Sequence, residues 1–136
     1  MKTVKNILVA IGNESSLNRC LGIAIPIAKG FNASITCIYV LAPFPRNLQV
    51  ALEQSANKLE KENAGKYLEI AKEKCKASGI EFKQIIAKGQ PREAIIENEK
   101  GFDLIVIGRS DWGSKMLGSV SNGVVSKSTK DILLVK

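Results

Sequence analysis

The chain has 136 residues, enough for one domain with a core of its own. Hydrophobic residues make up 45% and charged residues 24%, a composition that excludes a disordered chain. The sequence has no histidine, which excludes a Ser-His-Asp triad and most zinc sites. No apolar run approaches the ~18 residues of a membrane span, and the start of the chain lacks the features of a signal peptide. We therefore expect a single cytoplasmic domain over residues 1–136, with no membrane contact.

The net charge of +7 comes from 20 basic and 13 acidic side chains. A basic surface attracts anions, nucleotides among them. The lysines are scattered and often alternate with glutamate, and no aromatic residues interleave a basic cluster, so the pattern does not favour nucleic-acid binding. Cys20, Cys37 and Cys75 lie far apart in apolar surroundings, and we interpret them as buried, reduced thiols.

The first predicted elements are a strand and a helix. Residues 4–11 form a short apolar run that ends at Gly12, as expected of a strand buried on both faces. Residues 13–16 supply cap residues for a helix. Within that helix, Pro26 should cause a kink or shorten the regular part, and Gly30 should be the stop.

The rest of the chain continues the alternation. Strands are predicted at 33–41, 80–87, 103–107 and 131–135, and helices at 48–78, between Pro91 and Gly101, and at 119–129. In the last helix, Val120, Val124 and Val125 should face inward. Regular alternation of this kind predicts an α/β protein with three layers, α/β/α, around a five-stranded parallel sheet. Right-handed crossovers favour a doubly wound sheet in the order 3-2-1-4-5.

In that order the sheet has its switch point between the first and fourth strands, where ligands bind at the carboxyl ends. The loops that meet there are Gly12–Ser16 and Gly108–Gly118. The second loop starts at a strand end and leads to Gly118-Ser119 at a helix start. A helix start offers unpaired N–H groups and a positive dipole end to a phosphate. The alternative for Gly118-Ser119 is an ordinary N-cap, which needs no ligand.

Some side chains of the second loop favour a bound phosphate, and one opposes it. Arg109, Ser110 and Lys115 would suit a phosphate, whereas the charge of Asp111 would repel one. Trp112, the only tryptophan, could cover the site, contact a partner or pack on a neighbouring helix.

The same residues carry a resemblance to the universal stress protein family over essentially the whole chain. The matching segments are ILVAIGNESS, IYV at the end of the second strand, GQPREAIIENEKGFDLIVIG, GSVSNGVVSKS and the final ILLVK. The family pattern G-x-P-x-x-x-I…A/F-D-L-I-V-x-G runs here from Gly89 to Gly108. The resemblance implies a small cytoplasmic α/β protein, usually a dimer, in a family where some members bind ATP and others do not.

The resemblance also implies which residues would hold a nucleotide. ATP-binding members have a glycine, two residues, a glycine, nine residues, and then Gly-Ser or Gly-Thr. Gly108 and Gly118-Ser119 match the ends of this pattern, but Asp111 stands at the middle glycine and the loop is about three residues shorter. The family's aspartate after the first strand has no counterpart, and Asn13 stands nearby. Val40 matches the position whose backbone faces adenine. The residues implied for ATP or a related adenine nucleotide, with Mg²⁺ if ATP is bound, are Ile11, Gly12, Asn13, Val40, Ile107, Gly108, Arg109, Gly118, Ser119, Val120 and Ser121.

Three functions stay open at this stage. The first is a regulatory protein of the stress response that binds an adenine nucleotide at the carboxyl ends of strands 1 and 4. The second is a dimeric interaction module that no longer binds nucleotide. The third is an enzyme with at most weak ATP hydrolysis, for which we assign no catalytic residue and no metal ligand. The apolar terminal strand Ile132–Val135 would be an open sheet edge and predicts a homodimer, with a further protein partner that the sequence does not identify.

Overall fold

The structure, a computed structural model, describes residues 3–41, 50–109 and 119–136. Strands and helices alternate along these segments: β1 (Asn6–Ile11), α1 (Glu14–Phe31), β2 (Ser34–Leu41), α2 (Val50–Ala77), β3 (Phe82–Lys88), α3 (Pro91–Glu97), β4 (Leu104–Gly108), α4 (Ser119–Lys127) and β5 (Asp131–Val135). The predicted site residue Gly118 and its neighbours Ser110, Asp111, Trp112 and Lys115 lie outside the described residues.

The five strands form one parallel sheet in the order β3-β2-β1-β4-β5, which confirms the predicted order and winding. Strand β1 lies at the centre, where Ile7 pairs with Ile35 of β2 on one side and with Leu104 of β4 on the other. A central parallel strand is covered by helices on both faces, so both of its faces must be apolar. The short runs of β-branched and other apolar residues in this chain meet that requirement.

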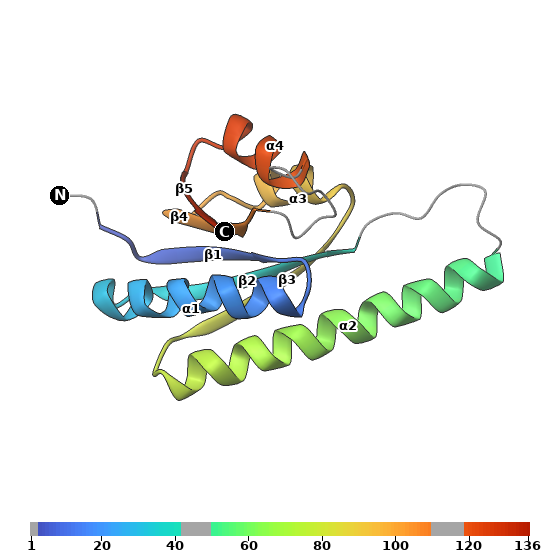
Figure 1. The fold of residues 1–136 in the computed structure, drawn as a ribbon, viewed down its shortest axis with the longest axis horizontal. Helices are drawn as coiled ribbons and strands as arrows, with labels where there is room; N and C mark the ends of the chain where they lie inside the picture. Colours follow the sequence, from blue (N-terminus) through green and yellow to red (C-terminus); the bar gives the residue numbers. More distant parts are fainter. Residues whose placement is uncertain (1–2, 42–49, 110–118) are drawn as a thin grey trace.

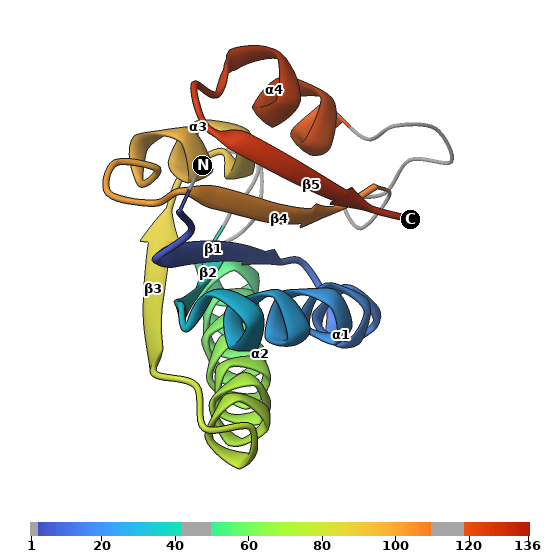
Figure 2. The same cartoon turned by 90° about the vertical axis from the view of Figure 1, so that its left-hand side faces the viewer.

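Helices cover both faces of the sheet and complete three layers (Figures 1 and 2). Helices α1 and α2 pack on one face, and α3 and α4 pack on the other. Alternate residues of β1 divide between the two cores, so that Val9 belongs to the α1–α2 side and Leu8 to the α3–α4 side. No helix in the described segments is long and apolar enough to span a membrane.

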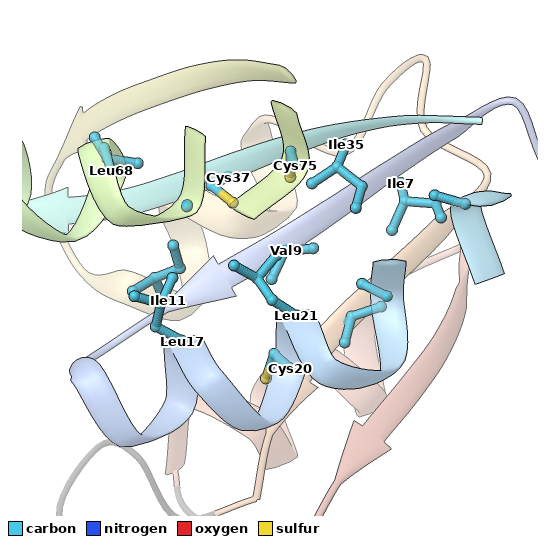
Figure 3. Packing of buried hydrophobic residues seen from close by; sticks show 14 of the residues in the cluster. Ile7, Val9, Ile11, Leu17, Cys20, Leu21, Ile35, Cys37, Leu68 and Cys75 are labelled. Atoms are coloured by element: carbon cyan, nitrogen blue, oxygen red, sulfur yellow. The ribbon is translucent and has the colours of Figure 1, made fainter. Parts of the chain in front are cut away.

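The three cysteines belong to the core on the α1–α2 side (Figure 3). Cys20 lies on α1, Cys37 on β2 and Cys75 on α2, and each is a fully buried free thiol. Burial raises the pKa of Cys37 well above its ordinary value, and the pKa of Cys75 to about 11. These thiols therefore act as small apolar side chains, as predicted.

Two predictions about helices were wrong: the end of α1 at Gly30 and the inward position of Val125 on α4. Helix α1 runs through Gly30 to Phe31 and ends at Asn32, which takes the left-handed conformation (φ 57°) and donates its N–H to the carbonyls of Ala28 and Lys29. Asparagine tolerates this conformation because its side chain is short and polar. On α4, Val120 and Val124 are buried, but Val125 is 45% exposed, because it lies on the outer side of the helix.

A carboxylate joins the amino ends of the two central strands. Asp103, just before β4, accepts hydrogen bonds from the backbone N–H groups of Lys5 (2.8 Å) and Asn6 (3.0 Å). The N–H of Asp103 in turn donates to the carbonyl of Asn6 (2.8 Å). The two backbone donors hold the pKa of the Asp103 carboxyl below its usual range. This clamp helps to fix the register of β4 against β1.

We predict that Asp103→Asn lowers the free energy of unfolding at pH 7, because the charged acceptor for two backbone N–H groups is lost. A lowered carboxyl pKa stabilises the fold above the unfolded-state value of about 3.9, and this contribution disappears as pH falls through the folded-state pKa. The difference between wild type and variant in urea unfolding should therefore shrink below about pH 4. Glu69→Gln, which neutralises an exposed carboxyl on α2, is the control for charge alone. A difference that does not change with pH would contradict the role of the carboxylate.

Candidate nucleotide-binding site

The pairing of β1 with β4 brings the two predicted ligand loops together. Val9 pairs with Val106, so the strand ends at Ile11 and Gly108 lie on neighbouring strands and point the same way. Gly12 follows β1 directly, and Arg109 follows β4 directly. The carboxyl ends of these strands therefore meet where the direction of winding changes.

The described site residues differ in exposure. The predicted site residues on strands and helices are buried: Ile11, Val40, Ile107, Gly108, Val120 and Ser121. Those on loops, Gly12, Asn13 and Arg109, are half-buried. Val40 lies one residue beyond Tyr39, which pairs with Ile11. The three strands β2, β1 and β4 thus each bring at least one predicted contact to the carboxyl end of the sheet.

The turn between β1 and α1 is closed by its own hydrogen bonds. The hydroxyl oxygen of Ser16 accepts from the N–H groups of Gly12 (3.0 Å) and Asn13 (3.1 Å) and donates to the carbonyl of Asn13 (2.9 Å). The side-chain oxygen of Asn13 accepts from the N–H of Ser16 (2.9 Å). Together these bonds form a capping box at the start of α1.

Sequence reasoning named Asn13 as a ligand contact but did not assign Ser16 to the site. The spacing of Asn13 and Ser16, at the N-cap and the third helical position, is the signal that could have found this pair. The structure uses the Asn13 oxygen in the cap, and Ser16 is fully buried. The conformation of the turn between β1 and α1 is therefore fixed by its own hydrogen bonds.

The two helices that begin at this end of the sheet differ in the charge of their first turns. The start of α1 is capped by Asn13 and Ser16 and carries Glu14 in its first turn. The first turn of α4, which begins at Ser119, has no acidic residue. An anion is therefore better placed at α4, where first-turn N–H groups and the helix dipole attract it and no carboxylate of that turn competes.

The start of α4 is fixed against the end of β4. The hydroxyl of the buried Ser121 donates to the carbonyl of Arg109 (2.9 Å), while the N–H of Arg109 donates to the carbonyl of Val135 on β5 (2.9 Å). Ser121, which the resemblance places among the ligand residues, has this structural bond as well. Because the backbone of Arg109 is held on both sides, its half-buried side chain projects from a fixed point.

The far end of α4 is fixed against α3. Glu99, just after α3, accepts hydrogen bonds from the hydroxyls of Ser128 and Thr129. Gly123 lies against Arg92 of α3 so closely that a Cβ there would come 2.7 Å from the Arg92 Cδ. Contacts at both ends of α4 therefore hold its N-terminus beside β4.

Helix α2 is tied to the carboxyl end of β2 by Tyr39. The phenol donates to the Glu60 carboxylate (3.1 Å), and its ring lies 6.1 Å from that of Tyr67, between centroids. Partial burial, with the charge of Glu60, raises the pKa of Tyr39 above its ordinary value of 10, so the phenol keeps its proton at neutral pH. Sequence reasoning missed this contact, because nothing in the pattern aligns residue 39 with residue 60.

These features define a class of protein: a doubly wound α/β protein whose candidate site lies at the switch point of its sheet. Within the described residues, no group of three His, Cys, Asp or Glu side chains is arranged to hold a metal ion. The site residues there include the Arg109 guanidinium and the first-turn N–H groups of α4, which are suited to a phosphate.

The chain belongs to the universal stress protein family, whose sequence model matches residues 3–136. A relative is the universal stress protein YxiE of Bacillus subtilis, which is 33% identical over 147 residues of alignment. That alignment covers 95% of this chain and 97% of the relative. The resemblance inferred from the sequence is therefore confirmed.

Solved structures of universal stress proteins have the same fold. One of them, in complex with cAMP, superposes with a TM-score of 0.75 at 24% identity and covers 99% of each chain. Another, from Archaeoglobus fulgidus in complex with dAMP, has a TM-score of 0.74 at 21% identity and covers 99% of this chain and 100% of its own. At these identities the superpositions establish the fold.

We predict that Ser16→Ala lowers the free energy of unfolding by about 1–2 kcal/mol, because two backbone N–H groups lose their shared acceptor. Urea unfolding measures this change. Ser15→Ala removes the exposed neighbouring hydroxyl and should cost less than about 0.5 kcal/mol. Equal stabilities for the two variants would show that the capping box does not hold the turn.

Proposed function

We propose that this protein binds an adenine nucleotide at the carboxyl ends of β1 and β4 and acts in the cytoplasm as a regulatory protein of the stress response. The observation that carries the proposal is that the bond from Ser121 to Arg109 holds the first turn of α4, which has no acidic residue, beside the end of β4 at Gly108. Family membership supports the identity of the ligand, since related structures hold cAMP and dAMP.

The nucleotide would lie across the edge of the sheet. We assign its adenine to the backbone beside Val40, and its ribose to the half-buried turn at Gly12 and Asn13. Its phosphates would lie at Gly108 and Ser119, with the Arg109 guanidinium as the charged partner. When ATP is bound, Mg²⁺ would be held mainly through the phosphates, as is usual for this ion.

A signalling role fits this chemistry better than a catalytic one. The chain contains no histidine to serve as a general base, and we assign no catalytic residue. The bound nucleotide is then a ligand whose presence changes the state of the protein, and any hydrolysis of ATP is slow.

A second part of the proposal concerns assembly. Strand β5 pairs with β4 and forms one edge of the sheet, and its residues Ile132, Leu133 and Leu134 are each half-buried. An apolar edge of this length favours pairing with another strand. We propose that two copies pair through Ile132–Val135 to form a two-fold dimer, and that a protein partner recognises the dimer.

Nucleotide binding should raise the melting temperature of the protein. A ligand at 100 times its Kd stabilises the folded state by about 2.7 kcal/mol, which corresponds to several degrees in a domain of this size. We expect this shift with millimolar AMP, and with ATP plus Mg²⁺, in a thermal-shift assay.

Gly118→Val should reduce that shift, because a side chain next to Ser119 would obstruct the approach of the phosphate. Gly65→Val is the matched control, because Gly65 lies on the exposed face of α2 with nothing within 4 Å of an added Cβ. The absence of a shift with wild-type protein at millimolar AMP and ATP would overturn the proposal.

For the dimer, Leu133→Lys should convert the wild-type mass measured by light scattering to that of a monomer, because it places a charge on the pairing edge. Val125→Lys puts the same charge on an exposed apolar position of α4 and should leave the mass unchanged. A wild-type monomer, or a dimer that survives Leu133→Lys, would contradict pairing through β5.

A further inference from the structure

A groove of about 370 Å³ lies between α1 and α2, away from the proposed nucleotide site. It is lined by Asn18, Leu21, Gly22, Ile25, Pro26, Lys74, Ala77 and Ser78. The α1 residues come from the middle of that helix, and the α2 residues from its last turn and the residue after it. None of the residues assigned to the nucleotide belongs to this set. The groove is therefore a separate surface.

The concave shape depends on a missing side chain. Gly22 is exposed, and a Cβ added there would meet no atom within 4 Å. The buried Leu21 and the half-buried Ile25 give the groove an apolar floor. On the α2 side, Ala77 has a small side chain and takes up little of the groove's width. The space above Gly22 is therefore open to an apolar side chain of a partner.

Gly22, which lines the groove, has a backbone carbonyl without its regular helical donor. In a regular helix the residue at position 26 donates its N–H to the carbonyl of residue 22, but Pro26 has no N–H. The Gly22 carbonyl therefore lacks its usual i+4 partner at a position with no side chain to shield it. A hydrogen-bond donor on a bound segment could use this oxygen.

The charge at the groove has one sign. Lys74 is exposed and is the one charged residue that lines it. The next hollow along, which shares Ser78, carries one lysine and one glutamate, Lys29 and Glu81, so charge there is balanced. With a net charge of +7 over the whole chain, the groove is complementary to an acidic partner.

We propose that the α1–α2 groove is a docking site for a short acidic segment of a partner protein. The segment would place one apolar side chain over Gly22 and Ile25, donate a hydrogen bond to the Gly22 carbonyl, and pair a carboxylate with Lys74. This mode combines an apolar anchor with a charged rim, as in other grooves that bind peptide segments.

The test uses a phage-displayed library of random 12-residue peptides, selected on the full-length protein without nucleotide. We expect the selected sequences to combine Asp or Glu with a central Leu, Ile or Phe. A fluorescein-labelled peptide of the selected sequence is then titrated with wild type and variants by fluorescence polarisation. Gly22→Leu should weaken binding at least tenfold, because the added side chain fills the groove, and Lys74→Glu should weaken it severalfold.

Two matched variants control for folding and for charge. Gly65→Leu places the same side chain on an exposed helical position outside the groove, and Lys72→Glu reverses a charge on the other side of α2. Both should bind like wild type.

Selected peptides without acidic residues, or binding that survives Gly22→Leu, would overturn the proposal. So would sedimentation showing that Gly22→Leu dissociates a dimer, since the occupant would then be a second copy of the chain. Because no nucleotide is present, the outcome is independent of the proposed nucleotide function.

Discussion

The parallel pairing of β1 with β4 is the constraint on which the rest of the structure depends. Strand β1 pairs with β2 on one side and β4 on the other, so the helices that follow β1 and β4 lie on opposite faces of the sheet. That pairing opens the switch point between the turn at Gly12 and the strand end at Gly108. The Asp103 carboxylate clamps the opposite ends of the same two strands. The register of one strand pair thus fixes the place where a ligand can bind.

At this edge, the protein treats its two helix starts differently. The N-terminus of α1 is closed by the capping box of Asn13 and Ser16, and Glu14 adds a negative charge to its first turn. The N-terminus of α4 has no acidic residue in its first turn and is held beside β4 by the bond from Ser121 to Arg109. The start of α1 is therefore structural, and the start of α4 is suited to an anion, although each helix follows a strand at the switch point.

Much of the fold could be predicted from the sequence, because short apolar runs such as residues 4–11 have few alternatives to a buried parallel strand. The sheet order followed from alternation and the handedness of crossovers. Helix ends were less predictable. The type and position of Gly30 predict that it ends α1, whereas Asn32 provides the left-handed cap. The apolar character of Val125 predicts an inward position, but the angular position of a residue on a short helix depends on packing that the sequence pattern does not contain.

The candidate site was predictable in location but not in detail. Gly12, Val40 and Gly108 come to one edge because strand order alone puts them there. The contact of Tyr39 with Glu60 joins residues far apart in sequence, and no local pattern could predict it. The same limit applies to the α1–α2 groove, since Pro26 was expected to kink or shorten the helix. Helix α1 is not shortened at Pro26 but continues to Phe31, and Pro26 lines the groove.

On the proposed function, an adenine nucleotide binds at the carboxyl ends of β1 and β4. Amide chemical shifts of ¹⁵N-labelled protein during a titration with AMP test it most directly, because each site residue reports separately. We expect the amide signals of four site residues to move together and saturate: Gly12, Gly108, Arg109 and Ser119. Those of Ser78 and Gly79, at the far end of α2, should stay in place. Saturable shifts confined to another part of the molecule, or no shifts at millimolar AMP, would contradict it.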